Sequence, residues 1–385
     1  MRIGIPIERA AGERRVGLTP QAVSVLIDAG HRVYLESGAG ERAGYADTSY
    51  DEAGAQLVYD PAEIYGRAEL VAKVSPLDAD ELHLIEESLI VFAFHRGSLS
   101  SPRMTRIVRD RHVTLVSYER VEEENGNRPV QNLMSEIAGS VAVLKAVGYL
   151  MSDAGGIGIA PGFVWGVPPA TFVVVGCGMA GIQAVRTAVG VGASVVAIDR
   201  DLERLRELDR LHVGRVVTTM ANRPSLKRAV RAADALILAV NEEQRLPLVT
   251  REMVRTMRPG SVLVDLAVAS GGAAETSRPT TADEPVFIEE NVTHLCVPNL
   301  ASLVSRSASR ALSNLVVGYL LMVADNGLSA LLEHAGLRRA TIVYRGETTG
   351  QASSPAEGRP AGGQGASANG PVPRATSRAT RRIPQ

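Results

Sequence analysis

The sequence is poor in cysteine, and this narrows the kinds of protein that it can encode. Only Cys177 and Cys296 occur among the 385 residues, and they do not form a C-x-x-C pair. Two isolated cysteines indicate neither a disulfide framework nor a zinc site, so we predict no metal. A reducing compartment suits such a chain, and we predict that the protein is cytoplasmic.

The sequence also has neither a large net charge nor a long apolar stretch. Its formal net charge is −1, which gives no electrostatic footprint for nucleic acid. The first residues read as a strand followed by charges, without an apolar signal region. The apolar run at 315–324 is far shorter than the ~20 residues that span a bilayer. We therefore expect neither nucleic acid nor a membrane as a partner.

What the sequence does contain is a regular alternation of strand-like and helix-like segments. Strand-like runs in the first third lie at 2–5, 32–35, 70–74, 89–94 and 113–118. Helical patterns separate them, and two longer helices are predicted at 133–151 and 305–326. Alternation of this kind predicts an α/β protein with parallel sheets covered on both faces.

We predict two Rossmann-like, doubly wound domains joined by the long helices, the first of them discontinuous. The first domain would comprise 1–131 plus 304–346, and the second would comprise 132–303. Residues 351–385 are rich in Gly, Ser, Ala, Pro and Arg and poor in large apolar residues, which predicts a disordered tail.

The stretch 171–200 reads as strand, glycine turn, helix and strand, which is typical of a dinucleotide-binding unit. Its turn is Gly176-Cys177-Gly178-Met179-Ala180-Gly181. Free N–H groups at the start of the helix would face the phosphates. Asp199 ends the second strand, where its carboxylate can accept both ribose hydroxyls and would repel a 2′-phosphate, so NAD is favoured over NADP. The alternative is a glycine-rich turn in some other α/β protein.

Three polar residues stand at or near the ends of strands in the first third, where an open α/β sheet binds its ligands. Arg15 follows the first strand, Lys73 interrupts an apolar strand, and His95 ends another. A guanidinium suits a carboxylate, an ammonium polarises a carbonyl, and an imidazole shuttles protons near neutral pH. Each residue also has a structural alternative: a solvated loop arginine, a lysine that reaches solvent, and a histidine satisfied in the core.

These residues belong to a set of motifs that resembles the alanine dehydrogenases and, more distantly, the nucleotide-binding subunit of proton-translocating transhydrogenases. The resemblance runs from Met1 to about Gly346. Its motifs are Gly4-Ile5-Pro6, Glu13-Arg14-Arg15-Val16-Gly17-Leu18-Thr19-Pro20, Lys73-Val74, Phe94-His95, Met134-Ser135-Glu136-Ile137-Ala138-Gly139, the glycine turn, Val264-Asp265-Leu266-Ala267, Ser277-Arg278-Pro279-Thr280-Thr281 and Val297-Pro298-Asn299.

The resemblance implies an NAD-dependent amino-acid dehydrogenase that acts on L-alanine or a related small amino acid. Arg15 and Lys73 would hold the carboxylate and carbonyl of the 2-oxo acid, and His95 would be the acid/base. It also implies a homo-oligomer, either a hexamer or a dimer. The expected cofactor contacts come from the turn and from residues around it: Ser135, Gly176, Gly178, Met179, Ala180, Gly181, Asp199, Arg204, Val240 and Asn299.

One departure from the family pattern bears on the chemistry. Family members carry an aspartate of the catalytic centre where this chain has Ala269. Alanine can accept neither a proton nor a hydrogen bond, so the step that handles ammonia is in question. Two alternatives therefore stay open: a homologue acting on a different amino acid or imine, and a non-catalytic NAD-binding regulator. A third, a subunit of a transhydrogenase-like assembly, would require a separate membrane component.

Overall fold

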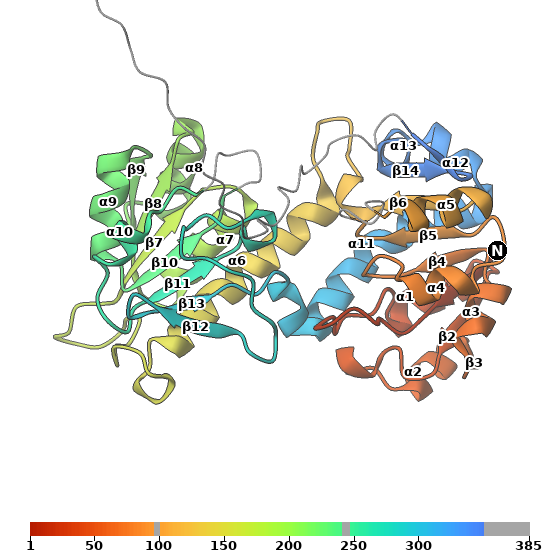
Figure 1. Ribbon diagram of the computed structural model, residues 1–385, viewed down its shortest axis with the longest axis horizontal. Helices are drawn as coiled ribbons and strands as arrows, with labels where there is room; N and C mark the ends of the chain where they lie inside the picture. The colour runs from red at the N-terminus through yellow and green to blue at the C-terminus, as the bar shows by residue number, and fades with distance from the viewer. Residues whose placement is uncertain (96–100, 241–246, 350–385) are drawn as a thin grey trace, which may run out of the picture. The chain divides into compact units, whose positions relative to one another are not determined.

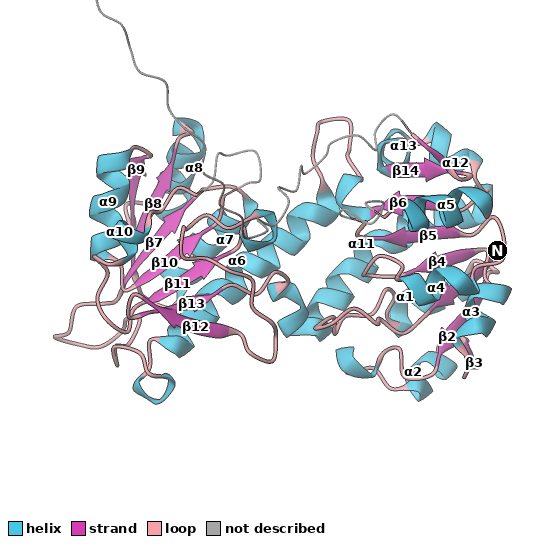
Figure 2. Ribbon diagram, viewed as in Figure 1, coloured by secondary structure: helices cyan, strands magenta, loops and turns pink. Residues whose placement is uncertain are grey.

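The computed structural model describes residues 1–95, 101–240 and 247–349. The predicted tail at 351–385 lies outside these residues. The described chain forms two β-sheets, each built mainly from parallel strands (Figure 1). Helices run alongside the strands of each sheet (Figure 2). This arrangement confirms the predicted α/β class with two Rossmann-like sheets.

The first sheet has the strand order β15-β14-β6-β5-β4-β1-β2-β3. β1 to β6 are mutually parallel, whereas β14 pairs antiparallel with β6 and β15 antiparallel with β14. The strands β14 and β15, near the end of the described chain, thus belong to the same sheet as β1. The strands are β1 (Arg2–Ile5), β2 (Arg32–Glu36), β3 (Gln56–Val58), β4 (Leu70–Ala72), β5 (Ile90–Ala93), β6 (Thr114–Ser117), β14 (Thr341–Tyr344) and β15 (Glu347–Thr348).

Short helices connect these strands. Several begin at a proline in the first turn, where the missing N–H costs no hydrogen bond. The helices are α1 (Pro20–Asp28), α2 (Asp47–Glu52), α3 (Pro61–Arg67), α4 (Ala79–Leu84), α5 (Pro102–Asp110), α12 (Ser329–Glu333) and α13 (Ala335–Ala340).

The second sheet has the order β12-β13-β11-β10-β7-β8-β9. Without the antiparallel edge strand β12, its six parallel strands follow the 3-2-1-4-5-6 order of a complete dinucleotide-binding sheet. The elements are β7 (Thr171–Val175), α7 (Met179–Gly190), β8 (Ser194–Asp199), α8 (Leu202–His212), β9 (Val216–Met220), α9 (Arg223–Ala232), β10 (Ala235–Leu238), α10 (Arg251–Val254), β11 (Val262–Asp265), β12 (Val286–Glu289) and β13 (Val292–Leu295).

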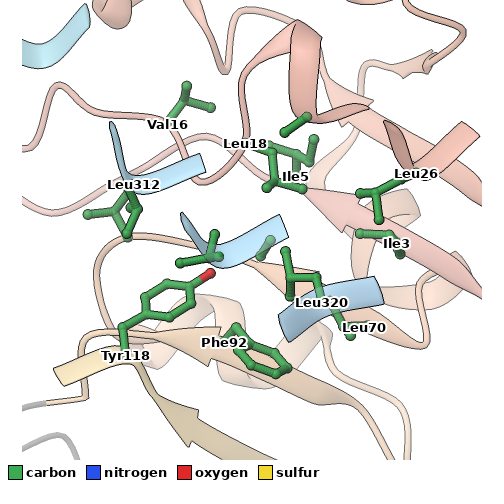
Figure 3. Packing of buried hydrophobic residues seen from close by; sticks show 14 of the residues in the cluster. Ile3, Ile5, Val16, Leu18, Leu26, Leu70, Phe92, Tyr118, Leu312 and Leu320 are labelled. Atoms are coloured by element: carbon green, nitrogen blue, oxygen red, sulfur yellow. The ribbon is translucent and has the colours of Figure 1, made fainter. Parts of the chain in front are cut away.

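Two long helices complete the described fold, α6 (Pro129–Tyr149) and α11 (Ser305–Asn326). The apolar face of α11 packs on the first sheet, where Leu312 and Leu320 meet Ile3, Leu70 and Phe92 in one core (Figure 3). The stretch Leu300–Asn326 is long and apolar enough to cross a membrane by length and composition alone. Its fully buried leucines and valines instead line the core of the sheet, as in the central helix of a globular protein.

Candidate active site

Three neighbouring strands of the first sheet bring the charged candidates to one edge. β1, β4 and β5 lie side by side and run parallel, so their carboxyl ends meet at the same edge. Lys73 directly follows β4, and His95 follows β5. The loop after β1 crosses the end of β4 so closely that a Cβ on Gly17 would overlap the carbonyl of Ala72. This contact holds the loop that carries Arg15 against the strand end that carries Lys73.

Arg15 points into the protein, with only 7% of its surface exposed. Its Nε and Nη2 atoms donate to the two carboxylate oxygens of Glu13, at 2.8 and 2.6 Å. Its Nη1 atom lies 3.2 Å from the sulfur of Met134 in α6, and its guanidinium carbon is 5.6 Å from the ring centre of Phe94. The alternative of a solvated loop arginine is therefore wrong, whereas the neighbouring Arg14 is exposed.

Lys73 is almost completely buried and does not reach solvent. Its ammonium lies 2.5 Å from a carboxylate oxygen of Glu81 and 3.7 Å from one of Glu8. Glu81 also accepts a hydrogen bond of 2.7 Å from the Tyr65 hydroxyl. Burial lowers the pKa of Lys73, but the carboxylates of Glu8 and Glu81 outweigh it and raise that pKa above its ordinary value. The lysine therefore stays charged at neutral pH, and an ammonium has three N–H donors.

Glu8 and Glu81 were not among the predicted site residues. Glu8 accepts backbone hydrogen bonds from Val74 and Ser75, at 2.6 and 3.0 Å. Burial raises its pKa even though Lys73 and these two N–H groups oppose the shift. A signal for Glu81 was present in the sequence, because Asp78 and Glu81 form the capping box that begins α4. No comparable local pattern marks Glu8.

His95 is held as a neutral imidazole with one free nitrogen. Its Nε2 atom lies 3.3 Å from the carbonyl oxygen of Val91. Because a carbonyl oxygen can only accept a hydrogen bond, Nε2 is the nitrogen that carries the hydrogen. Nδ1 is then the acceptor, and it is buried without a partner among the described residues. Burial lowers the pKa of His95 to about 4. The charge of Lys73 acts in the same direction, whereas the hydrogen bond to Val91 opposes the shift. This histidine can accept a proton at neutral pH.

The glycine turn joins β7 to α7 as predicted. Gly176 has a φ of +93°, and a Cβ on Gly181 would overlap the carbonyl of Gly176. The N-terminus of α7 has no side-chain cap, so the N–H groups of its first turn are not taken up by a side chain. An uncapped helix start next to a tight glycine turn is suited to bind a phosphate group.

Asp199 ends β8 beside this turn and is 95% buried. One carboxylate oxygen accepts from the Cys177 N–H at 2.5 Å and the other from the Asp201 N–H at 2.8 Å. Arg204 is the group closest to the space above Gly178, and a methyl group of Val240 borders Gly176. Met179 and Ala180 open α7 directly after Gly178. Most predicted cofactor residues thus surround one turn.

The other predicted residues lie outside the segment 176–240. Ser135 is half-buried in α6, one turn before the point where Gly139 contacts the Ala180 carbonyl. Asn299 lies just beyond β13 and donates from Nδ2 to Glu13 at 2.8 Å, so it joins the Arg15 cluster. Ala269 is exposed in a short 3-10 turn. Within 1–95, 101–240 and 247–349, no group of three His, Cys, Asp or Glu residues could hold a metal ion.

The second sheet, its glycine turn and the charged strand ends of the first sheet together define a two-domain α/β protein of the Rossmann class. Comparison with known protein families identifies the family within this class. The N-terminal domain of the alanine dehydrogenase/PNT family matches residues 4–138, and its C-terminal domain matches residues 142–351. The chain belongs to this family.

Individual relatives agree with the family match over nearly the whole chain. An alanine dehydrogenase of Methanococcus maripaludis is 35% identical, covering 94% of this chain and 97% of the relative. The alanine dehydrogenase of Bacillus subtilis is 37% identical, covering 91% and 93%. A solved L-alanine dehydrogenase superposes with a TM-score of 0.87 at 37% identity, covering 91% of this chain and 98% of that one. A transhydrogenase from Sinorhizobium meliloti, at 24% identity and a TM-score of 0.79, shares the fold.

Proposed function

We propose that this protein is an NAD-dependent amino-acid dehydrogenase. It would reversibly convert L-alanine, or a related small amino acid, into the 2-oxo acid and ammonia. The observation that carries this proposal is the cluster at the ends of β1, β4 and β5. There a buried guanidinium, a buried ammonium and a neutral imidazole with a free nitrogen lie at one sheet edge. The relatives named alanine dehydrogenase support the same reaction class.

The residues around the glycine turn fit NAD. Each oxygen of Asp199 accepts one backbone N–H, and a carboxylate oxygen has a second lone pair with which to accept a ribose hydroxyl. The uncapped start of α7 and the guanidinium of Arg204 would hold the pyrophosphate. When bound there, NAD would supply the acceptor for the hydride that leaves the α-carbon of the amino acid. The proposed contacts are Ser135, Gly176, Gly178, Met179, Ala180, Gly181, Asp199, Arg204, Val240 and Asn299.

Arg15 would bind the substrate carboxylate with the part of its fork that Glu13 leaves free. Glu13 occupies one N–H each of Nε and Nη2, and Nη1 lies against the Met134 sulfur, so the remaining N–H groups of Nη1 and Nη2 would bind the substrate. Lys73 would donate one of its remaining N–H groups to the carbonyl oxygen and stabilise the charge that develops there. His95 would accept a proton on Nδ1 from the water that adds to the imine and return it to the departing amine.

Several properties of the whole protein belong to the same proposal. The substrate would be a small amino acid or 2-oxo acid, and the chain would act in the cytoplasm as a homo-oligomer, a hexamer or a dimer. The domains would comprise 1–131 plus 304–346 and 132–303. Light scattering of the purified protein tests the oligomer directly: a monomeric mass would contradict it.

Steady-state assays with NADH, ammonia and a panel of 2-oxo acids test the reaction. We expect NADH oxidation with pyruvate or a close homologue, and its loss in Arg15→Ala. If NADH binds but no 2-oxo acid is turned over, the protein is a binding regulator and the proposed reaction is wrong. If NADH does not bind either, the proposal fails at its first step.

The variant Ala269→Asp tests whether the absence of a carboxylate at this position limits the rate of the reaction. Because Ala269 is exposed in its 3-10 turn, an aspartate fits there without displacing a core residue. Alanine oxidation should rise in Ala269→Asp if that carboxylate separates this chain from its relatives. Ser270→Asp is the matched control, since it adds the same charge one residue away and should leave the rate unchanged.

A further inference from the structure

Glu13 stands between two groups that the proposed reaction assigns to different ligands. Its carboxylate is 97% buried. It holds Arg15 by two side-chain hydrogen bonds, and Oε1 also accepts the backbone N–H groups of Arg14 and Arg15, at 3.1 and 2.9 Å. Oε2 accepts the Nδ2 of Asn299 at 2.8 Å. One buried carboxylate therefore fixes the position of Arg15 and is itself bonded to Asn299.

Asn299 lies where the chain passes from the second sheet to α11. It follows β13 and directly precedes a 3-10 turn (Leu300–Val304) that runs into α11. α11 also holds the loop after β1, because the hydroxyls of Ser309 and Ser313 accept the backbone N–H groups of Val16 and Thr19, at 3.0 and 2.8 Å. The loop of Glu13 is thus attached at three points to the segment that leaves the proposed cofactor sheet.

The orientation of the Asn299 amide follows from this contact. A carboxylate only accepts hydrogen bonds, so Asn299 turns its NH₂ group toward Glu13, and its oxygen remains free to accept a bond from a ligand. A ligand that donates to this oxygen would fix the amide and with it Glu13. Because a flexible guanidinium loses entropy when it binds a carboxylate, an Arg15 already held by a fixed Glu13 binds that carboxylate more tightly.

We propose that Glu13 is a positioning residue that couples NADH binding at Asn299 to carboxylate binding at Arg15. This inference rests on the proposed function, since it takes the cofactor and substrate contacts from there. Coupling between two binding sites is reciprocal, so NADH should strengthen oxo-acid binding by the same factor by which the oxo acid strengthens NADH binding. Couplings of this kind typically amount to roughly tenfold.

Calorimetry with oxamate, an unreactive analogue of a small 2-oxo acid, measures this coupling in the full-length protein. The quantity is the ratio of oxamate affinities with saturating NADH and without nucleotide. We expect a ratio of roughly ten for the unmodified protein. In Asn299→Ala the ratio should fall toward one, while oxamate affinity without NADH changes little, because Arg15 keeps its bonds to Glu13.

An exchange variant separates coupling from simple damage. Glu13→Gln alone should lower the ratio, because an amide NH₂ in place of Oε2 would face both the NH₂ of Asn299 and the Nη2 of Arg15. Glu13→Gln combined with Asn299→Asp reverses donor and acceptor, keeps the net charge and should recover part of the ratio. Arg14→Ala is the matched control: its exposed side chain forms an ion pair with the exposed Asp283, so the ratio should stay at the unmodified value.

The outcomes distinguish failure of the coupling from failure of the proposed function. A protein that binds NADH and oxamate, but whose ratio is unchanged in Asn299→Ala, overturns the coupling and leaves the proposed function standing. A protein that binds neither NADH nor oxamate overturns the proposed function itself.

Discussion

The two cations at the strand ends are each buried beside a carboxylate. Arg15 is paired with Glu13, and Lys73 is paired with Glu81 and lies near Glu8. An isolated buried charge costs several kcal/mol, so each cation requires such a partner. The pairing holds the two cations in fixed positions, and N–H groups on both remain to bind a ligand.

The uncharged member of the cluster, His95, should make the fold sensitive to acid. Its pKa in the folded protein is about 4 because of burial, against ~6.5 for a free histidine. As pH falls from ~6.5 toward 4, the unfolded chain binds the proton first, so unfolding is favoured. His95 should thus reduce the free energy of unfolding by about 2 kcal/mol between pH 7.5 and pH 5. Urea titrations at both pH values should show that much less acid sensitivity in His95→Gln.

His112→Asn is the control for this measurement. His112 is exposed in the turn after α5 with a φ of +51°, a conformation that asparagine tolerates. Its replacement should leave the difference between the two pH values as it is in the unmodified protein. Equal acid sensitivity in the unmodified protein and in His95→Gln would show that the imidazole is not kept neutral by burial.

The helix α6 contacts the first turn of α7, which belongs to the proposed cofactor site. A Cβ on Gly139 of α6 would overlap the carbonyl of Ala180 in the first turn of α7, whereas a Cβ on Gly148 of the same helix meets nothing within 4 Å. Gly139→Ala should therefore push the first turn of α7 away, cost about 1–3 kcal/mol of stability and weaken NADH binding at least tenfold. Thermal unfolding and NADH titration by fluorescence measure both effects.

Gly148→Ala provides the comparison within the same helix. Alanine is a better helix former than glycine by about 0.5–1 kcal/mol, so this variant should be as stable as the unmodified protein or slightly more so, with unchanged NADH affinity. If Gly139→Ala behaves in the same way, the close approach of the two helices is not needed for the turn.

Elements with a local signal were predictable from the sequence. The helix predicted at 305–326 is α11 with the same bounds, because an apolar period of one helical turn continues up to Gly327. The glycine turn was equally clear. The helix predicted at 133–151 begins earlier, at Pro129, although proline in a first helical turn is itself a start signal. The predicted strand at 70–74 is shorter in the structure and ends at Ala72.

Partners that are distant in the chain were not predictable. Glu13 and Asn299 are 286 positions apart, and nothing near either residue indicates the other. The strand β14 was also not predictable, because its apolar run at 341–344 is short and the strand pairs with β6, which is far away in the sequence. The cations of the site could be proposed because charges stand out among apolar strands, whereas their carboxylates lie in ordinary polar loops and helices.

At the scale of the whole molecule, the last described strands, β14 and β15, extend the first sheet beyond β6. β14 pairs with β6, and Ile342 and Val343 are buried between the sheet and its helices. Thr349 then bonds back to β14, with its hydroxyl donating to the carbonyl of Thr341 at 2.7 Å. The first sheet is therefore incomplete without a segment that lies more than two hundred residues after β6.

Two truncations test how much the fold depends on this return. A chain that ends after Thr349 keeps β14, β15 and their hydrogen bonds, so its melting temperature should match that of the full chain. A chain that ends after Ala340 loses the burial of Ile342 and Val343, worth about 1.5–3 kcal/mol for each side chain, and leaves β6 as an open edge that can pair with other chains. It should melt at a lower temperature and aggregate, as calorimetry and light scattering would detect. Equal melting temperatures for the two truncations would mean that the first sheet is stable without its last two strands, and that the return of the chain serves the positioning of α11 instead.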